Sequence, residues 1–321
     1  MVGKISNHFY IDFYMIKIKL YILFVLNILV INCKGQKKEQ QMDKITEEII
    51  KLVHQYPTTP MYSLQMNKQG CKLVVEMENN VDYRLVENNG ESIMIPLNVM
   101  ITKSGKQRLK VKIYPKEGDQ YITKYAHVQV NIFNAPNKNS SLKDYAKIAE
   151  FTLPQGLEEQ KLPYYEQSIE FEANVPFDYS RELNTATDLS KLKDIEEKVL
   201  KKYNEVREIC EKSDIIAYNK LSIHSSALVY NTTYASIEEI KNSQHSNRFG
   251  IVESNLNNRQ FLPIENYAIQ FYANNKIVAL WQKNHNPSLY MKGENSSGKV
   301  VEGGDPLFLY MPEGSKELKA W

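Results

Sequence analysis

Cysteine, histidine and serine side chains are the residues of this chain most able to do chemistry, and none has the spacing of a familiar catalytic or metal-binding motif. The 321 residues include three cysteines and six histidines, which are too scattered for a tetrahedral zinc site. His224 precedes Ser225 on a predicted helix, where adjacent side chains point in different directions. The sequence therefore predicts no catalytic residue, no metal and no cofactor, although a dispersed triad leaves no sequence signature.

One segment has the glycine and lysine spacing of a phosphate-binding loop. Gly293–Lys299 fits the first seven positions of the pattern G-x-x-x-x-G-K, but Val300 follows where Ser or Thr should hold magnesium. Such a loop must also begin a helix whose amides face the phosphates, whereas the residues after Val300 read as a strand. We therefore predict a polar hairpin loop.

Aromatic side chains are the candidate binding residues. The chain has 21 tyrosines, of which Tyr164, Tyr165 and Tyr179 flank the last predicted strand of the first domain, while Trp281 ends a predicted hairpin. Aromatic rings bury a large area at low entropic cost, which suits stacking on a sugar or anchoring a protein partner. Packing in the core is the alternative interpretation, since aromatics favour strands in any case.

A row of basic residues lies along one predicted strand. Arg108, Lys110 and Lys112 occupy its polar side, and Lys103, Lys106 and Lys116 lie near its ends. These residues would suit an anionic ligand or lipid headgroups. The interpretation that we favour is a solvated outer strand, whose lysines discourage pairing with another edge.

The N-terminal segment has the pattern of an export signal. An apolar run, Leu20–Ile31, is too short to span a bilayer and follows two lysines. Asn32 and Cys33 follow this run. The segment Leu29–Cys33 resembles the lipobox of bacterial lipoproteins processed by signal peptidase II. The resemblance implies that residues 1–33 form a signal peptide with the lipobox cysteine, that Cys33 is acylated, and that the chain is anchored in a membrane.

The first residue of the signal segment is undecided, and the residue after Cys33 suggests a compartment. Met15 with the two following lysines would make a short basic start, but the sequence does not decide between Met1 and Met15. Lys34 follows the cysteine, where lipoproteins of the inner membrane commonly carry Asp. The resemblance thus implies a cell-envelope protein, at the outer membrane and facing the periplasm or the surface.

Charge argues against nucleic acid as a partner. The formal charge of the whole chain is +2, and removal of residues 1–32 would take away three lysines and one aspartate, leaving a neutral chain. Nucleic-acid binding requires an excess of basic residues.

The chain that remains after residue 32 is longer than a single hydrophobic core usually supports, so two domains are expected.

The first expected domain, 61–180, reads as an antiparallel β-sandwich of the Ig-like or jelly-roll-like kind. Apolar residues alternate with polar ones in successive runs, which indicates half-buried strands. Turn residues such as Asn88-Asn89-Gly90 separate the runs, without helices between them. The runs include 73–77, 93–101, 109–113, 128–132 and 169–175.

The second expected domain, 187–321, is α+β. A long helix over 189–210 and shorter ones over 213–229 and 237–241 precede strands, among them a hairpin at 267–281 turned by Asn274 and Asn275. Residues 34–60 are expected to form a linker and a short amphipathic helix over 43–55. The order of elements is loosely similar to nuclear-transport-factor-2-like folds, which enclose a pocket.

The function expected from these features is non-catalytic binding by a lipid-anchored envelope protein. The partner would be the membrane through Cys33 together with another envelope protein or a glycan, with neutralisation of a toxin as one case. The alternative is an enzyme whose active site lies in a pocket of the C-terminal α+β domain. A passive spacer is a third interpretation. An exposed aromatic patch favours binding, and a pocket of groups with shifted pKa values favours an enzyme.

Overall fold

The computed structural model describes residues 37–245 and 250–321, so the predicted signal segment and Cys33 lie outside the described residues. Residues 61–177, here called the N-terminal lobe, contain strands only and short 3-10 turns. The strands are β1 (Met61–Gln69), β2 (Cys71–Met77), β3 (Asp82–Leu85), β4 (Glu91–Pro96), β5 (Gly105–Pro115), β6 (His127–Ala135), β7 (Ala146–Thr152) and β8 (Tyr165–Ala173).

The N-terminal lobe consists of two four-stranded sheets with the orders β4-β1-β6-β7 and β3-β2-β5-β8. Every pairing within them is antiparallel, as the runs without intervening helices predicted. Period-two alternation puts the apolar side chains of each strand on one face. Those of Leu64 and Val130 from one sheet and Val75 and Val111 from the other belong to one buried cluster.

Two details of this lobe differ from the sequence-based expectations. The run expected as one strand over 93–101 stops at Pro96 and continues as a 3-10 turn, Leu97–Met100. The fully buried Asn98 fixes this turn, because its Oδ1 accepts a 2.6 Å hydrogen bond from the Tyr62 amide. The basic strand, β5, lies between β2 and β8, so the expectation that it is an outer strand is wrong.

Residues 37–52, 180–245 and 250–321 form the C-terminal lobe. Its helices are one over residues 37–52, α2 (Ser180–Thr185), α3 (Ile195–Glu211), α4 (Ile215–Leu221), α5 (Ile223–Thr232) and α6 (Ile237–His245). Its strands are β9 (Asn257–Phe261), β10 (Tyr267–Tyr272), β11 (Ile277–Gln282), β12 (Leu289–Glu294), β13 (Val300–Asp305), β14 (Leu309–Tyr310) and β15 (Lys319–Ala320). They pair antiparallel in the orders β10-β11-β14-β15 and β13-β12-β9.

The chain is therefore a mixture of helices and antiparallel sheets, as expected. The predicted hairpin is β10–β11, and both Asn274 and Asn275 have positive φ, at 55° and 66°. The glycine-rich segment is the polar loop between β12 and β13, which confirms that prediction.

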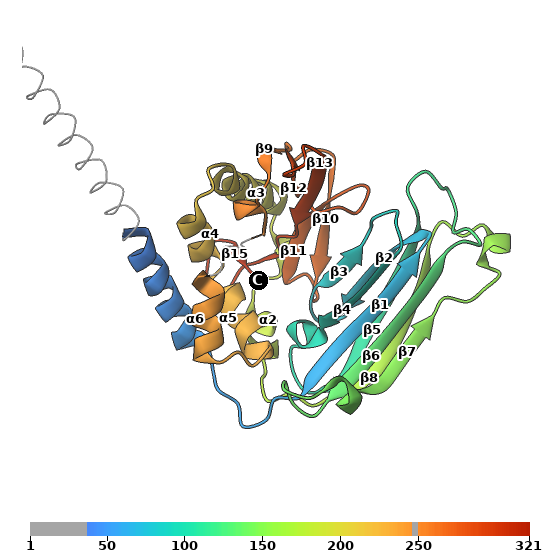
Figure 1. The fold of residues 1–321 in the computed structure, drawn as a ribbon, viewed down its shortest axis with the longest axis horizontal. Helices are drawn as coiled ribbons and strands as arrows, with labels where there is room; N and C mark the ends of the chain where they lie inside the picture. Colours follow the sequence, from blue (N-terminus) through green and yellow to red (C-terminus); the bar gives the residue numbers. More distant parts are fainter. Residues whose placement is uncertain (1–36, 246–249) are drawn as a thin grey trace, which may run out of the picture.

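Helix boundaries were predicted less well. The long helix begins at Ile195 rather than 189, because Asp188 caps a separate 3-10 turn, Leu189–Lys191, by accepting from the Ser190 amide. The helix expected over 213–229 is two helices, broken at Ser222. The N-terminal helix, expected from 43, is already helical at residue 37, the first described residue, and packs on α4, α5 and α6 through Ile45 and Ile49. Figure 1 shows it beside α6.

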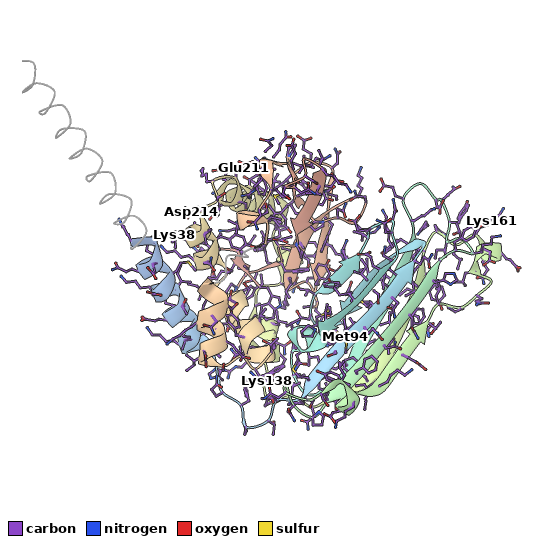
Figure 2. The ribbon with its side chains drawn as sticks, in the orientation of Figure 1. Lys38, Met94, Lys138, Lys161, Glu211 and Asp214 are labelled. Carbon is purple, nitrogen blue, oxygen red and sulfur yellow. The ribbon has the colours of Figure 1, made fainter. Side chains whose placement is uncertain are left out.

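The two lobes contact each other at the helical end of the molecule through Tyr234, which follows α5. Its ring belongs to the core of the N-terminal lobe, and its hydroxyl donates to the Pro60 carbonyl over 3.0 Å and accepts from Asn98 Nδ2 over 3.1 Å. Lys138 extends from the β6–β7 connection (Figure 2) to the Tyr234 carbonyl and to Glu239. The segment between the two expected domains contains most of α2.

Candidate functional site

A buried ion pair on β3 lies at the centre of the second contact between the lobes. Asp82 and Arg84 are two residues apart on a strand, so their side chains project from the same face. The guanidinium donates to Asp82 Oδ2 through both Nε, at 3.0 Å, and Nη2, at 2.7 Å. The side chains are 0 % and 6 % exposed. Burial raises the pKa of Asp82, whereas Arg84 and Tyr272 oppose that rise.

The C-terminal lobe contributes the other half of this polar network from its β10–β11 hairpin. Tyr272 donates its hydroxyl proton to Asp82 Oδ2 over 2.8 Å and accepts from Trp281 Nε1 over 2.8 Å. Arg84 Nη2 also donates to Gln270 Oε1 over 2.6 Å, and the guanidinium carbon lies 3.4 Å from the centre of the Trp281 ring. Asp82 Oδ1 is left without a hydrogen-bond partner among the described residues.

The loop between β11 and β12 extends this contact over the outer face of the sheet. Lys72 Nζ donates to the Asn284 carbonyl over 3.1 Å. The His285 ring lies 4.2 Å from the ring of Tyr114, which in turn lies 5.0 Å from Tyr164. Burial, with the charges of Arg84 and Lys72, lowers the pKa of His285 to about 4, so this imidazole is neutral at physiological pH.

A cavity of about 720 Å³ lies between the lobes beside this network. The N-terminal lobe lines it with Asp82–Glu87 and Gly90–Ile93, and the C-terminal lobe lines it with Trp281, Asn286, Pro287, Tyr290 and Gly303–Pro306. Figure 1 shows β3 and β4 on the side of the sheets that faces the C-terminal lobe. We call this space the interlobe cavity. Ligand sites occur preferentially at such junctions.

A second cavity, of about 460 Å³, lies within the C-terminal lobe and is lined in part by His224 and Trp321. His224 Nε2 lies 3.1 Å from Glu182 Oε1, and Tyr310 donates to the same oxygen over 2.6 Å. The pKa of Glu182 is lowered although burial opposes this, because the nearby His224 ring and the Tyr310 hydroxyl stabilise its charged form. His224 therefore contacts a carboxylate as well as the rings of Tyr310 and Trp321.

The basic residues of β5 are largely paired with acidic neighbours. Arg108 Nη2 lies 2.7 Å from Glu170 Oε1, Lys106 lies 2.6 Å from Glu170 Oε2, and Lys112 lies 2.5 Å from Glu76. Opposite charges on adjacent strands attract over such distances. These contacts leave less free positive charge for an anionic ligand than the sequence alone suggested.

The four aromatic candidates do not form one patch. Tyr164 is exposed and lies beside Tyr114, whereas Tyr165 packs against the core of the N-terminal lobe. Tyr179 contacts Phe177 near the start of α2. Trp281 is only 4 % exposed and its ring is covered by Arg84. Of the four, Trp281 lines the interlobe cavity.

Sequence reasoning missed Asp82 and Arg84, because β3 has only four residues and shows no long alternation. The signal that would have found them is the turn at Asn88-Asn89-Gly90, which implies a strand before it. A charged residue at each alternate position of that strand, Asp82 and Arg84, then indicates a polar face.

The two cysteines of the described residues are buried. Cys71 and Cys210 are free and buried, and burial raises their pKa values to about 11 and about 12, so both are thiols. In residues 37–245 and 250–321 no group of three His, Cys, Asp or Glu side chains is placed to hold a metal ion. Nor does any helix of these segments have the length and apolar character needed to cross a membrane.

Comparison of the chain with protein-family models, with curated proteins and with solved structures found no match.

Proposed function

We propose that this chain is an exported, lipid-anchored protein of the cell envelope that binds a partner non-catalytically between its two lobes. The observation that carries the proposal is the interlobe cavity of about 720 Å³, which has walls from both lobes. Its described lining includes no histidine, so the Ser92 hydroxyl has no imidazole base beside it there, as a Ser–His nucleophile would.

The proposed architecture follows from the same observations. Two four-stranded antiparallel sheets that share one apolar cluster fit a β-sandwich of the Ig-like or jelly-roll-like kind. The helices and antiparallel strands of the C-terminal lobe fit an α+β domain. Such sandwiches are common in exported binding proteins, although a fold alone does not determine function.

The envelope part of the proposal rests on the lipobox-like segment ending at Cys33, outside the described residues. Its test is the intact mass and membrane partition of the protein made in a bacterium, compared with Cys33→Ser. We expect the wild type to carry acyl chains on Cys33 as its first residue and the variant to lose membrane attachment. A wild type that keeps residues 1–32 would overturn the lipoprotein assignment.

The binding part is tested by photocrosslinking in intact cells. A benzoylphenylalanine at Tyr83, which lines the interlobe cavity, should crosslink a partner. The matched control is the same replacement at Tyr125, which is 66 % exposed and does not line that cavity. Crosslinking from neither position, or equally from both, would refute a specific site in the cavity.

The second candidate function is an enzyme with its site in the C-terminal lobe. The specific observation in its favour is the 3.1 Å contact of His224 with Glu182 at the second cavity, because a carboxylate can orient a histidine that acts as a base. The test is a panel of ester, amide and glycoside substrates with His224→Gln as the control. Turnover that the substitution abolishes would favour the enzyme over the binding protein.

A further inference from the structure

The interlobe cavity is bordered by three strands that lie at the edges of their sheets. β3 is an edge strand of the sheet β3-β2-β5-β8, and β4 is an edge strand of the sheet β4-β1-β6-β7. β13 is an edge strand of the three-stranded sheet β13-β12-β9. Residues of all three line the cavity. An edge strand has a row of N–H and C=O groups with no strand beside them, and such a row can pair with another chain.

The register of β3 shows which of its main-chain groups are free. The Met77 amide donates to the Val81 carbonyl over 3.1 Å, so this pair begins the hydrogen-bonded positions of the β2–β3 ladder. Hydrogen-bonded and non-hydrogen-bonded pairs alternate in an antiparallel ladder. The main-chain groups of Asp82 and Arg84 therefore point away from β2, and within the described residues no hydrogen bond involves them.

The side chains around the cavity favour a positively charged occupant. Four carboxylates, those of Asp82, Glu87, Glu91 and Asp305, line it against one guanidinium, that of Arg84. Arg84 compensates Asp82, and Lys68 lies 2.7 Å from Glu91. Glu87 has no ion-pair partner within residues 37–245 and 250–321 and is exposed.

We infer that the interlobe cavity binds an extended segment of a partner protein, added as a strand along β3, with a Lys or Arg side chain directed at Glu87. This inference rests on the proposed binding function and names its ligand class. Main-chain hydrogen bonds to the free groups of Asp82 and Arg84 supply affinity, and alternate side chains of the segment meet the cavity walls, as in other cases of β-strand addition. Tyr83 and Tyr290 also line the cavity.

The test uses the full chain in detergent and a capped hexapeptide of alternating valine and lysine. Binding is followed by calorimetry and by the chemical shifts of the β3 amides. Two control peptides keep the length, one with alternate amides N-methylated and one with glutamate in place of lysine. We expect the first control to lose at least tenfold in affinity, because it lacks the donors of a strand ladder, and the second to bind more weakly still.

Two pairs of variants assign the site. Val86 follows β3 at the next outward-facing position, so Val86→Pro removes one free N–H at an edge where proline is tolerated, while Val86→Ala is its control. We expect Val86→Pro to weaken the valine–lysine peptide about tenfold and Val86→Ala to leave it unchanged. Glu87→Gln should weaken it about threefold to tenfold, whereas Glu313→Gln, an exposed carboxylate that does not line the cavity, should not.

Each contrary outcome has a defined meaning. No binding of the valine–lysine peptide, or equal binding of the N-methylated one, overturns strand addition. Equal binding of the glutamate peptide overturns the preference for a cation. A dimer in the absence of peptide that Val86→Pro converts to monomer would identify a second copy as the occupant. If no peptide binds while a neutral saccharide shifts the NMR signal of the Trp281 indole, the proposed binding function is kept and the inferred ligand class is rejected.

Discussion

Replacement of Arg84 by methionine tests whether the buried pair holds the two lobes together. Methionine keeps most of the packed volume over Trp281 but removes two charge-assisted bonds to Asp82, at 3.0 and 2.7 Å. Each such bond contributes about 1.5–3 kcal/mol, and loss of one partner of a buried pair costs about 3–5 kcal/mol. The free energy of unfolding should therefore fall by several kcal/mol at pH 7.

Protonation of Asp82 limits that loss and makes it depend on pH. Burial already raises the pKa of Asp82, and removal of Arg84 removes the main opposing charge. Neutralising a carboxyl with an unfolded pKa near 3.9 costs about 4 kcal/mol at pH 7 and about 1.5 kcal/mol at pH 5. A group whose folded pKa is raised binds more protons in the native state, so stability falls as pH rises. The deficit of Arg84→Met should hence shrink between pH 7 and pH 5.

Urea unfolding followed by far-UV circular dichroism measures this effect. Tryptophan emission is unsuitable, because the guanidinium lies 3.4 Å above the Trp281 ring and its removal would change the signal directly. The control is the double variant Asp82→Leu/Arg84→Met, which leaves no buried charge and should be within about 2 kcal/mol of wild type. A single variant within about 1 kcal/mol of wild type, or a double variant as unstable as the single, would refute the reasoning.

The other predictions concern contacts that position the same elements. The pKa of His285 is lowered to about 4, so the free energy of unfolding of the wild type should decrease as the pH falls below about 6.5. His285→Gln should remove this contribution and flatten the pH dependence; an unchanged profile in urea titrations would contradict this. The side chain of Lys68 is fully buried and binds Glu91 and the carbonyls of the β3–β4 loop. Lys68→Met should therefore lower the unfolding free energy by about 2–4 kcal/mol and increase amide exchange in that loop; unchanged exchange would count against this. Tyr234→Phe should cost about 1–2 kcal/mol by thermal unfolding, since its hydroxyl joins Asn98 to the Pro60 carbonyl, and a cost near zero would show that this link is not stabilising.

The fold was predictable wherever one face of an element is buried. In β5, Leu109, Val111 and Ile113 alternate with polar neighbours, and the structure buries all three while their neighbours stay at least partly exposed. In α3, the spacing of Val199, Tyr203 and Val206 predicted the buried stripe. Burial imposes a period of two or of 3.6 residues, and a local pattern records it.

The candidate site was not predictable, since its residues become neighbours only through contacts between distant segments. Arg84 and Gln270 are 186 residues apart in the chain, and no local period relates them. The break at Ser222 and the 3-10 turn after Pro96 were missed for a related reason. In each of these places hydrogen bonds of single side chains, such as those of Asn98 and Ser222, compete with the regular pattern.

What the sequence determined by itself is the longer strands and helices and the apolar face of each, because alternation and helical spacing are local consequences of burial. It also contains the lipobox-like segment on which the proposed anchoring depends. What only the tertiary structure decided is how the lobes meet. It placed β5 inside its sheet and left β3, β4 and β13 at sheet edges around one cavity. Strand order and the approach of two lobes are set by packing between residues far apart in the chain, and a local pattern carries no record of that packing.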